Sequence, residues 1–329
     1  MSGPPRPTED TPPRAIVLIL TGMVFITVND SLIKALSGDY PLHQMIFIRS
    51  AIALGMTLVI LQFEGGFRAL RTSTPVLHLM RGLLVVVSNM LIFAAIATLP
   101  LATATALFFV APLMITLMSV VFLKERVGLH RAGAIVVGFA GVLVMTRPGA
   151  EAGVDRPETW VLMLPVLAAT AYAGMQVMTR SLGVYSKAAA LAVYIQGTFL
   201  LVSIGFYLVA GDGRFAEGVE HQSLVFLLRA WVWPTPADWP LFLTLGLCSG
   251  VVGYCLSSAY KMGNAATVSS FEYAALPMAI ATGWGVFGEV PDLWMLAGTV
   301  LIAGAGIYVF MREARRRSPV APRRPLRRG

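Results

Sequence analysis

Long apolar runs separated by short polar or charged breaks make up nearly the whole chain. As a helix, a run of about 20 apolar residues is long enough to cross a hydrocarbon core about 30 Å thick. Placing the breaks at charges, Pro and Gly gives ten candidate spans. They cover residues 15–35, 43–63, 75–98, 101–123, 130–146, 158–180, 187–210, 239–261, 265–288 and 292–311. The pattern predicts an all-α polytopic membrane protein with ten transmembrane helices.

Composition supports the same class. Hydrophobic residues make up 57% of the 329 positions and charged residues 13%, about half the usual charged share of a soluble domain. The two cysteines, Cys248 and Cys255, fall on one helical face with no metal or redox motif beside them, so we interpret them as small core residues. The sequence therefore predicts no catalytic residue, no metal site and no cofactor.

The distribution of Lys and Arg predicts the orientation. With the N-terminus inside, the outer segments hold only five of the 25 basic residues: Lys34, Arg147, Arg156, Arg214 and Arg229. Since basic residues favour the cytoplasmic side, both termini are expected in the cytoplasm of a multi-pass protein of the cell inner membrane. Residues 1–13, rich in Pro, are expected to be a disordered cytoplasmic lead-in. The Arg-rich tail 312–329 is expected to meet anionic lipid of the bilayer rather than nucleic acid.

One connection is longer than the rest. Residues 211–238 contain the amphipathic stretch HQSLVFLLRAWVWP, with Trp231 and Trp233. Tryptophan is enriched at membrane interfaces, so this segment is expected to lie flat on the outer surface.

The two halves of the chain resemble each other. Between 104–147 and 269–312, one constant offset aligns Pro112 with Pro277, Gly133 with Gly298, Gly141 with Gly306 and Arg147 with Arg312, and a one-residue slip aligns Glu125 with Glu289. The predicted domains are therefore two five-helix repeats, 14–147 and 158–311. Because five is odd, the second repeat crosses the membrane in the opposite sense, as in transporters that hold substrate between inverted halves.

The matched residues have different expected roles. A single proline is ordinarily a tolerated kink, but Pro112 and Pro277 recur in opposite halves and are interpreted as hinges or helix breaks that line a cavity. Glu125 and Glu289 each end a span and are interpreted as loop anchors rather than ligands. The paired glycines are expected to allow close helix packing.

These motifs resemble a known family. The P…KER…G…G…GV pattern of 112–142 is similar to the EamA-type repeats of the drug/metabolite transporter superfamily, although GEVPDLW in the second half departs from that pattern. NDSLIK, IFIRS and LMRG in the first three spans resemble a branch that includes riboflavin and S-adenosylmethionine carriers. The resemblance implies two five-helix repeats, ten spans and transport, and it does not specify a substrate.

Four ionisable residues lie inside the spans: Asp30, Arg49, Arg81 and Glu272. Charges inside a membrane are costly, so each is a candidate functional residue. At 1.5 Å per residue, Asp30 and Arg49 come to about the same depth below the outer side, and Arg81 and Glu272 to about the same depth above the inner side. Two interpretations stay open. The pairs are internal struts, or they line the outer and inner approaches to a substrate cavity.

Polar and aromatic residues extend this candidate set. Gln176 takes the position of Asp30 in the second repeat, and Gln196 lies within one residue of the counterpart of Arg49. Side chains of Asn89, Tyr172, Tyr273 and Trp284, with Asn29, offer hydrogen bonds and stacking surface to a heterocyclic solute, or serve only in helix packing.

We therefore expect a secondary transporter that moves a small polar organic metabolite by alternating access, as a monomer or homodimer. Balanced intramembrane charge suits a zwitterionic or neutral polar solute, and the coupling ion, if there is one, is left open. The alternative is a membrane receptor or scaffold that transports nothing. An intramembrane enzyme is disfavoured because the sequence has neither a His-Glu-X-X-His nor a Gly-X-Ser-X-Gly motif.

Overall fold

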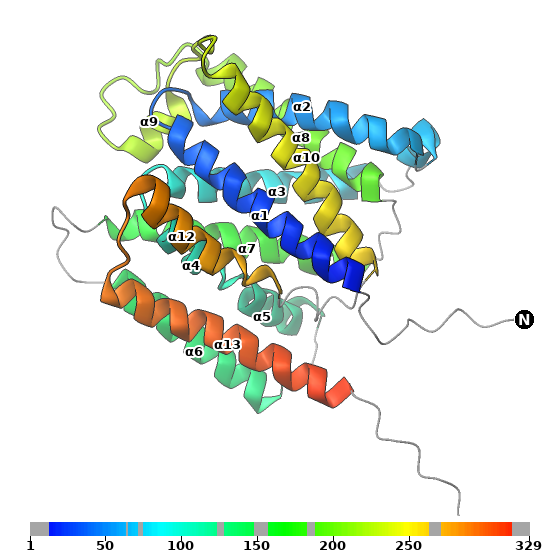
Figure 1. Ribbon diagram of the computed structural model, residues 1–329, viewed down its shortest axis with the longest axis vertical. Helices are drawn as coiled ribbons and strands as arrows, with labels where there is room; N and C mark the ends of the chain where they lie inside the picture. The colour runs from blue at the N-terminus through cyan, green and yellow to red at the C-terminus, as the bar shows by residue number, and fades with distance from the viewer. Residues whose placement is uncertain are drawn as a thin grey trace, which may run out of the picture.

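A computed structural model describes residues 13–63, 65–71, 75–123, 128–147, 157–182, 188–262 and 271–317. These residues form a bundle of helices (Figure 1). The helices are α1 (Pro13–Leu36), α2 (Leu42–Phe63), α3 (Pro75–Ile96), α4 (Leu101–Phe108), α5 (Ala111–Leu123), α6 (Leu129–Thr146), α7 (Thr159–Leu182), α8 (Ala188–Ala210), α9 (Gln222–Leu228), α10 (Trp239–Met262), α12 (Ala275–Phe287) and α13 (Leu293–Arg317), with a 3-10 helix η1 at Gly66–Leu70.

Each predicted span corresponds to helix in the described part of the chain. Seven helical stretches are long and apolar enough to cross a membrane, and three shorter apolar helices, 132–146, 275–287 and 293–309, account for the remaining predicted spans. Large apolar side chains are exposed along many of these helices, including Val17, Phe63, Leu208 and Val286. An apolar exterior on long apolar helices is what a bilayer requires, so the protein is an all-α polytopic membrane protein.

The fourth and ninth predicted spans are not continuous helices. The fourth is interrupted at Phe109 and Val110, between α4 and α5, and the ninth at Tyr273 and Ala274, just before α12. Each interruption comes immediately before a helix with a proline in its first turn. Proline has no N–H to donate to the carbonyl four residues earlier, and its ring clashes with that carbonyl. Both helices are thus interrupted beside a proline, and the roles of Pro112 and Pro277 as hinges that line a cavity stay predictions.

The packing of the helices is what the predicted repeat would produce, and the repeat itself stays a prediction. If α1, α2, α3, α4–α5 and α6 correspond to α7, α8, α10, α12 and α13, every major contact has its counterpart. The contact of α1 with α10 matches that of α7 with α3, and the contact of α2 with α10 matches that of α8 with α3. Three further contacts, of α2 with α8, α4 with α12 and α6 with α13, join corresponding helices directly. An internal two-fold relation between the halves requires this arrangement.

The paired glycines lie where two helices approach closely. A Cβ on Gly141 of α6 would be 2.9 Å from the carbonyl oxygen of Gly298 on α13, and a Cβ on Gly298 would be 2.7 Å from that of Gly141. These two positions leave no room for a side chain, so the expected packing role is confirmed here. Gly133, in contrast, has nothing within 4 Å of its Cβ position.

The chain enters and leaves the bundle at one end, and α9 lies at the other (Figure 1). The connection 211–238 is hydrogen-bonded to the ends of other helices at this second end. His43 Nδ1 lies 3.0 Å from the carbonyl oxygen of Leu227, and the guanidinium of Arg229 donates to the carbonyls of Ser37 and Gly38. Buried Phe226 lies in the core, so this segment is a cover fastened to the helix ends. We call this the outer end, following the predicted orientation.

Candidate functional site

The two helix breaks meet inside the bundle. Phe109, in the break of the first half, stacks on Tyr273, in the break of the second, with ring centroids 4.8 Å apart and planes inclined by 27°. Helices α4 and α12 also pack against each other. Irregular backbone at membrane depth is tolerated only where protein or a water-filled cavity surrounds it. The junction of the breaks is therefore the natural centre for a site between the halves.

Several predicted polar residues gather beside this junction. Gln176 Nε2 donates a hydrogen bond of 2.8 Å to the hydroxyl of Tyr172, one turn earlier on α7. The ring of Tyr172 lies 5.7 Å from that of Phe108, the last residue of α4. The charge of Glu272 acts on both Tyr172 and Tyr273. The structure thus brings Tyr172, Gln176 and Glu272, three of the predicted site residues, into one cluster.

Asp30 and Arg49 lie near enough for their charges to interact. Their charges interact across the gap between α1 and α2, without a direct ion pair. Asp30 accepts a hydrogen bond of 3.2 Å from Asn29. Arg49 is only 3% exposed, and its Cζ lies 5.1 Å from the ring centroids of both Phe93 and Phe199.

The two members of the other predicted pair, Arg81 and Glu272, have different neighbours. The charge of Arg81 acts on His78, one turn earlier on α3, and His78 stacks on Tyr194 at 4.5 Å. Glu272 lies with Tyr172 and Tyr273, as described above. The pairing of Arg81 with Glu272 therefore stays a prediction.

Three other predicted positions contribute less than expected. Trp284 on α12 is 68% exposed, so its position does not support a role in a central site. The hydroxyl of Tyr273 points at α13, where a Cβ on Gly306 would be 1.6 Å from it. Asn89 donates a hydrogen bond of 3.0 Å to the carbonyl of Val85 in its own helix.

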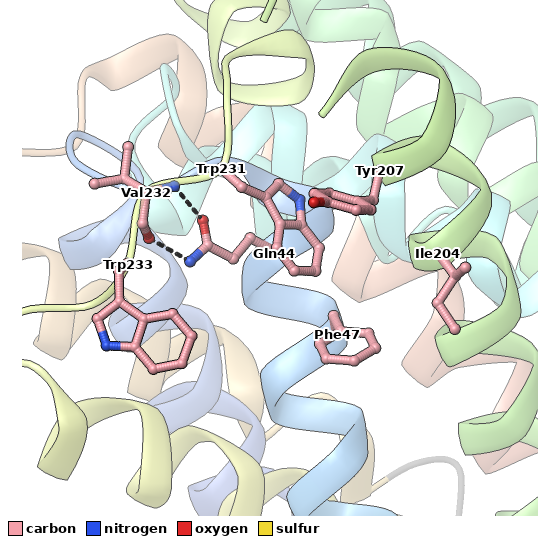
Figure 2. Close-up of a pocket in the computed structure, with 7 residues that line it drawn as sticks. All are labelled: Gln44, Phe47, Ile204, Tyr207, Trp231, Val232 and Trp233. Atoms are coloured by element: carbon pink, nitrogen blue, oxygen red, sulfur yellow. Dashed lines mark hydrogen bonds between the residues drawn. The ribbon is translucent and has the colours of Figure 1, made fainter. Parts of the chain in front are cut away.

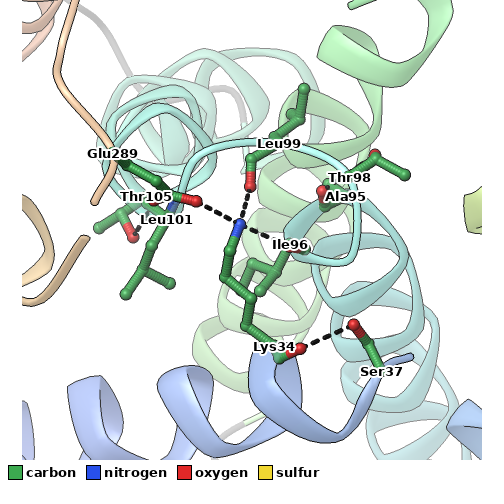
Figure 3. A network of polar contacts seen from close by, with 9 residues as sticks. All are labelled: Lys34, Ser37, Ala95, Ile96, Thr98, Leu99, Leu101, Thr105 and Glu289. Atoms are coloured by element: carbon green, nitrogen blue, oxygen red, sulfur yellow. Dashed lines mark hydrogen bonds and ion pairs between the residues drawn. The ribbon is translucent and has the colours of Figure 1, made fainter. Parts of the chain in front are cut away.

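A buried ion pair ties the two halves together at the outer end (Figure 3). Lys34 Nζ lies 2.6 Å from Glu289 Oε1, and it also donates to the carbonyls of Leu99 at 2.6 Å and Ile96 at 3.3 Å. The other carboxylate oxygen of Glu289 accepts from the backbone N–H of Leu101, the first residue of α4, at 2.8 Å. We call Lys34 and Glu289, with these three backbone groups, the outer latch.

The outer latch was only half predicted. Glu289 is a loop anchor, as expected, and its aligned partner Glu125 lies outside the described residues. Lys34 was read as an ordinary outer-side charge. The sequence did contain a signal for this ion pair, because Lys34 and Glu289 have opposite charges and lie at the ends of their spans on the same side of the membrane. The aromatic neighbours Phe93, Phe108 and Phe199 had no such signal, since phenylalanine occurs in nine of the ten predicted spans.

A separate cavity of about 470 Å³ lies near the outer end (Figure 2). In it the side-chain amide of Gln44 pairs with the backbone of Val232, donating at 2.5 Å and accepting at 3.0 Å. At 100° per residue, Gln44 and Phe47 lie on the opposite face of α2 from Arg49. This pocket is therefore distinct from the space between Asp30 and Arg49. Its lining residues are Gln44, Phe47, Ile204, Tyr207, Trp231, Val232 and Trp233.

The described residues contain no group of three or more His, Cys, Asp or Glu side chains able to hold a metal ion. The candidate site is thus built from isolated charges, amides and aromatic rings.

The chain is similar to known membrane transporters in sequence and to a solved structure in fold. Residues 13–147 match the model of the EamA-like transporter family. A riboflavin transporter of Rhizobium johnstonii is 29% identical over 310 residues, which cover 93% of this chain and 94% of that protein. An S-adenosylmethionine uptake transporter of Rickettsia bellii is 25% identical over 296 residues, covering 89% and 92%. A crystal structure of a protein 20% identical to this chain superposes with a TM-score of 0.61, covers 93% of this chain and 99% of its own, and shows the same fold.

Proposed function

We propose that this chain, which carries an EamA-family domain over residues 13–147, is a membrane transporter that moves a small polar organic metabolite by alternating access. The observation that carries the proposal is the contact between the two helix breaks, Phe109 on Tyr273. Broken helices that face each other from inverted halves supply a binding region near the midplane and a place where each half bends. The relatives support the same function, because they are named as transporters and this chain matches them over nearly their whole length.

The outer latch supports the alternating-access part of the proposal. It joins α1 and the α3–α4 connection of the first half to the α12–α13 connection of the second. A transporter must close one end while the other is open, and a bond between the halves at one end achieves this. In this state the outer end is closed.

The substrate class follows from the relatives and from the site. Riboflavin and S-adenosylmethionine, named for the two relatives above, are both polar heterocyclic metabolites. The cluster of Tyr172, Gln176 and Glu272 offers a ring, an amide and a carboxylate to such a solute. We infer a riboflavin-like or S-adenosylmethionine-like solute, and no enzymatic step.

We place the protein in the cell inner membrane with both termini in the cytoplasm. The outer end carries Lys34, Arg147, Arg214 and Arg229, whereas most basic residues belong to the opposite side and the tail. Reporter fusions at residues 150 and 225 are expected to read periplasmic, and a fusion at the C-terminus cytoplasmic. A cytoplasmic signal at 225 would contradict this orientation.

The test is solute uptake by the purified full chain in lipid vesicles, with labelled riboflavin and labelled S-adenosylmethionine as the first probes. Uptake above that of protein-free vesicles, saturable and abolished by excess unlabelled probe, is the expected result. Stabilisation by a probe that never enters the vesicles would instead favour the alternative, a receptor or scaffold. In that case the helix breaks serve no transport.

A further inference from the structure

Arg49 is a buried charge with an unused hydrogen-bond donor, its Nε. It is 3% exposed on α2, its Nε has no hydrogen-bond partner, and its contacts in the described part of the chain are with the Phe93 and Phe199 rings. Aromatic faces stabilise a cation but take few of its N–H groups. A guanidinium has five N–H donors in a rigid fork, which fits a carboxylate in a bidentate arrangement. Arg49 is thus equipped for a planar anionic group.

Asp30 and Asn29 supply hydrogen-bond acceptors that complement the donors of Arg49. Asn29 Nδ2 donates to the Asp30 carboxylate at 3.2 Å, and this leaves the other end of the amide, Asn29 Oδ1, buried with no partner. A half-buried carboxylate and a free carbonyl oxygen therefore lie side by side on α1. An ammonium group has three donors and no acceptor, so it matches a pair of acceptors of this kind.

Asp30 and Arg49 lie at one depth and are held apart. Asp30 is six residues from the end of α1 and Arg49 seven residues from the start of α2, which puts both about 10 Å below the outer helix ends. Their charges interact, yet they form no direct ion pair. Elsewhere the same chain closes an ion pair fully, since Lys34 and Glu289 are 2.6 Å apart. A strut would be expected to close in the same way, because an open buried pair leaves both charges poorly compensated.

From this geometry we propose that Asp30, Asn29 and Arg49 bind a zwitterion, such as the amino-acid end of a metabolite. Arg49 takes the carboxylate, and Asp30 with Asn29 takes the ammonium. This inference rests on the proposed transport function and narrows its substrate. It separates the two solutes named above, because S-adenosylmethionine has an ammonium and a carboxylate, and riboflavin has neither.

The experiment measures binding of three probes to the purified full chain by the shift of its unfolding temperature, since a ligand of the folded state stabilises it. The probes are S-adenosylmethionine, its decarboxylated analogue and riboflavin. We expect S-adenosylmethionine to bind about tenfold to a hundredfold more tightly than the decarboxylated analogue, as loss of a charge-assisted hydrogen bond implies. Methionine and arginine extend the panel to smaller zwitterions.

Variants then assign this preference to a residue. In Arg49→Gln the two S-adenosyl probes should bind alike. Arg49→Lys keeps the charge beside Asp30 and so preserves folding, but it loses the fork and most of the carboxylate preference. The double variant Asp30→Asn, Arg49→Gln removes both charges and should fold yet bind no zwitterion. Arg214→Gln, in an exposed loop, is the matched control and should keep the preference.

The outcomes separate this inference from the proposed function. Stabilisation or uptake of riboflavin without any zwitterion would overturn the zwitterion site and leave transport standing. A carboxylate preference that survives Arg49→Gln in folded protein would also overturn it. Absence of both binding and uptake for every probe would count against the transport function itself.

Discussion

Lys34 and Glu289, 255 positions apart in the chain, meet in a 2.6 Å ion pair at the outer end of the bundle. Their side chains are 14% and 17% exposed, the other hydrogen bonds of the two charged groups are to the backbone of Ile96, Leu99 and Leu101, and Lys34 Nζ also lies 5.5 Å from the ring centroid of Phe287. The turn that presents Glu289 depends on Gly288, whose φ of 66° ends α12 in the left-handed region that glycine adopts without strain. The latch therefore joins elements of both halves and opens only if they separate.

Loss of the latch should shift the protein towards an outward-open state. Glu289→Gln leaves the Lys34 ammonium largely buried without its counter-charge, at a cost on the order of 2 kcal/mol. Because 1.4 kcal/mol is a factor of ten in an equilibrium constant, the ratio of closed to open molecules should fall at least tenfold. Labelling of a cysteine introduced at the outer end should become faster, and net transport should fall.

A surface pair supplies the control for this prediction. Asp212 and Arg214 lie 3.8 Å apart in one exposed connection. Exposed pairs contribute little, so Asp212→Asn should change neither labelling nor transport. Equal effects of Asp212→Asn and Glu289→Gln would reduce the latch to an ordinary surface contact.

The two prolines should matter for movement more than for folding. Pro112→Ala and Pro277→Ala restore an N–H and allow the helices to continue through the breaks. We expect transport per folded molecule to fall several-fold, with little change in the amount of folded protein. Pro165 lies within the unbroken helix α7, so Pro165→Ala is the matched control. Normal transport in both break variants would leave Pro112 and Pro277 as simple kinks.

Close packing of α6 on α13 makes Gly141 intolerant of a side chain. The new methyl group of Gly141→Ala would meet the Gly298 carbonyl oxygen and Ile302, each 2.9 Å away. Overpacking of this kind costs about 1–3 kcal/mol, so the unfolding temperature should drop. Gly133→Ala, on the same helix in open space, should be neutral or stabilising because alanine favours helix. Identical behaviour of the two variants would contradict the assigned packing.

Asp238 should make the outer end sensitive to acid. Hydrogen bonds from Tyr40 at 2.6 Å and Thr235 at 2.7 Å lower the pKa of Asp238 below its ordinary value of 3.8. A lowered pKa means that the stabilisation is complete above the ordinary value and disappears as pH falls through the folded one. Asp238→Asn should therefore unfold at a lower temperature than the unchanged chain at pH 7. The difference between the two unfolding temperatures should disappear as the pH falls well below 3.8, and a difference that persists there would contradict the assigned hydrogen bonds.

The sequence predicted the helices and their breaks because both follow from local chemistry. Apolar runs define helix length, and a proline removes one hydrogen bond wherever the helix lies. The common depth of Asp30 and Arg49 followed from residue counting along two consecutive helices. Each of these predictions needed only the chain near the residue concerned.

Contacts between distant segments were harder to predict. Residue counting gives depth but not rotation about the helix axis, which is why Trp284 was expected inside and lies on the exposed face of α12. The latch needed two loops from opposite halves to meet, and the aromatic neighbours of Arg49 come from α3 and α8. Such contacts depend on the packing of the whole bundle.

If the halves alternate about the latch and the breaks, the distance between them across the outer end should change. Spin labels at Ala35 and Val290, which are exposed beside Lys34 and Glu289, report the separation of the halves there. The account predicts two distance populations in lipid, with the longer one enriched by Glu289→Gln and the balance shifted by a transported solute. One distance, unchanged by either, would contradict it.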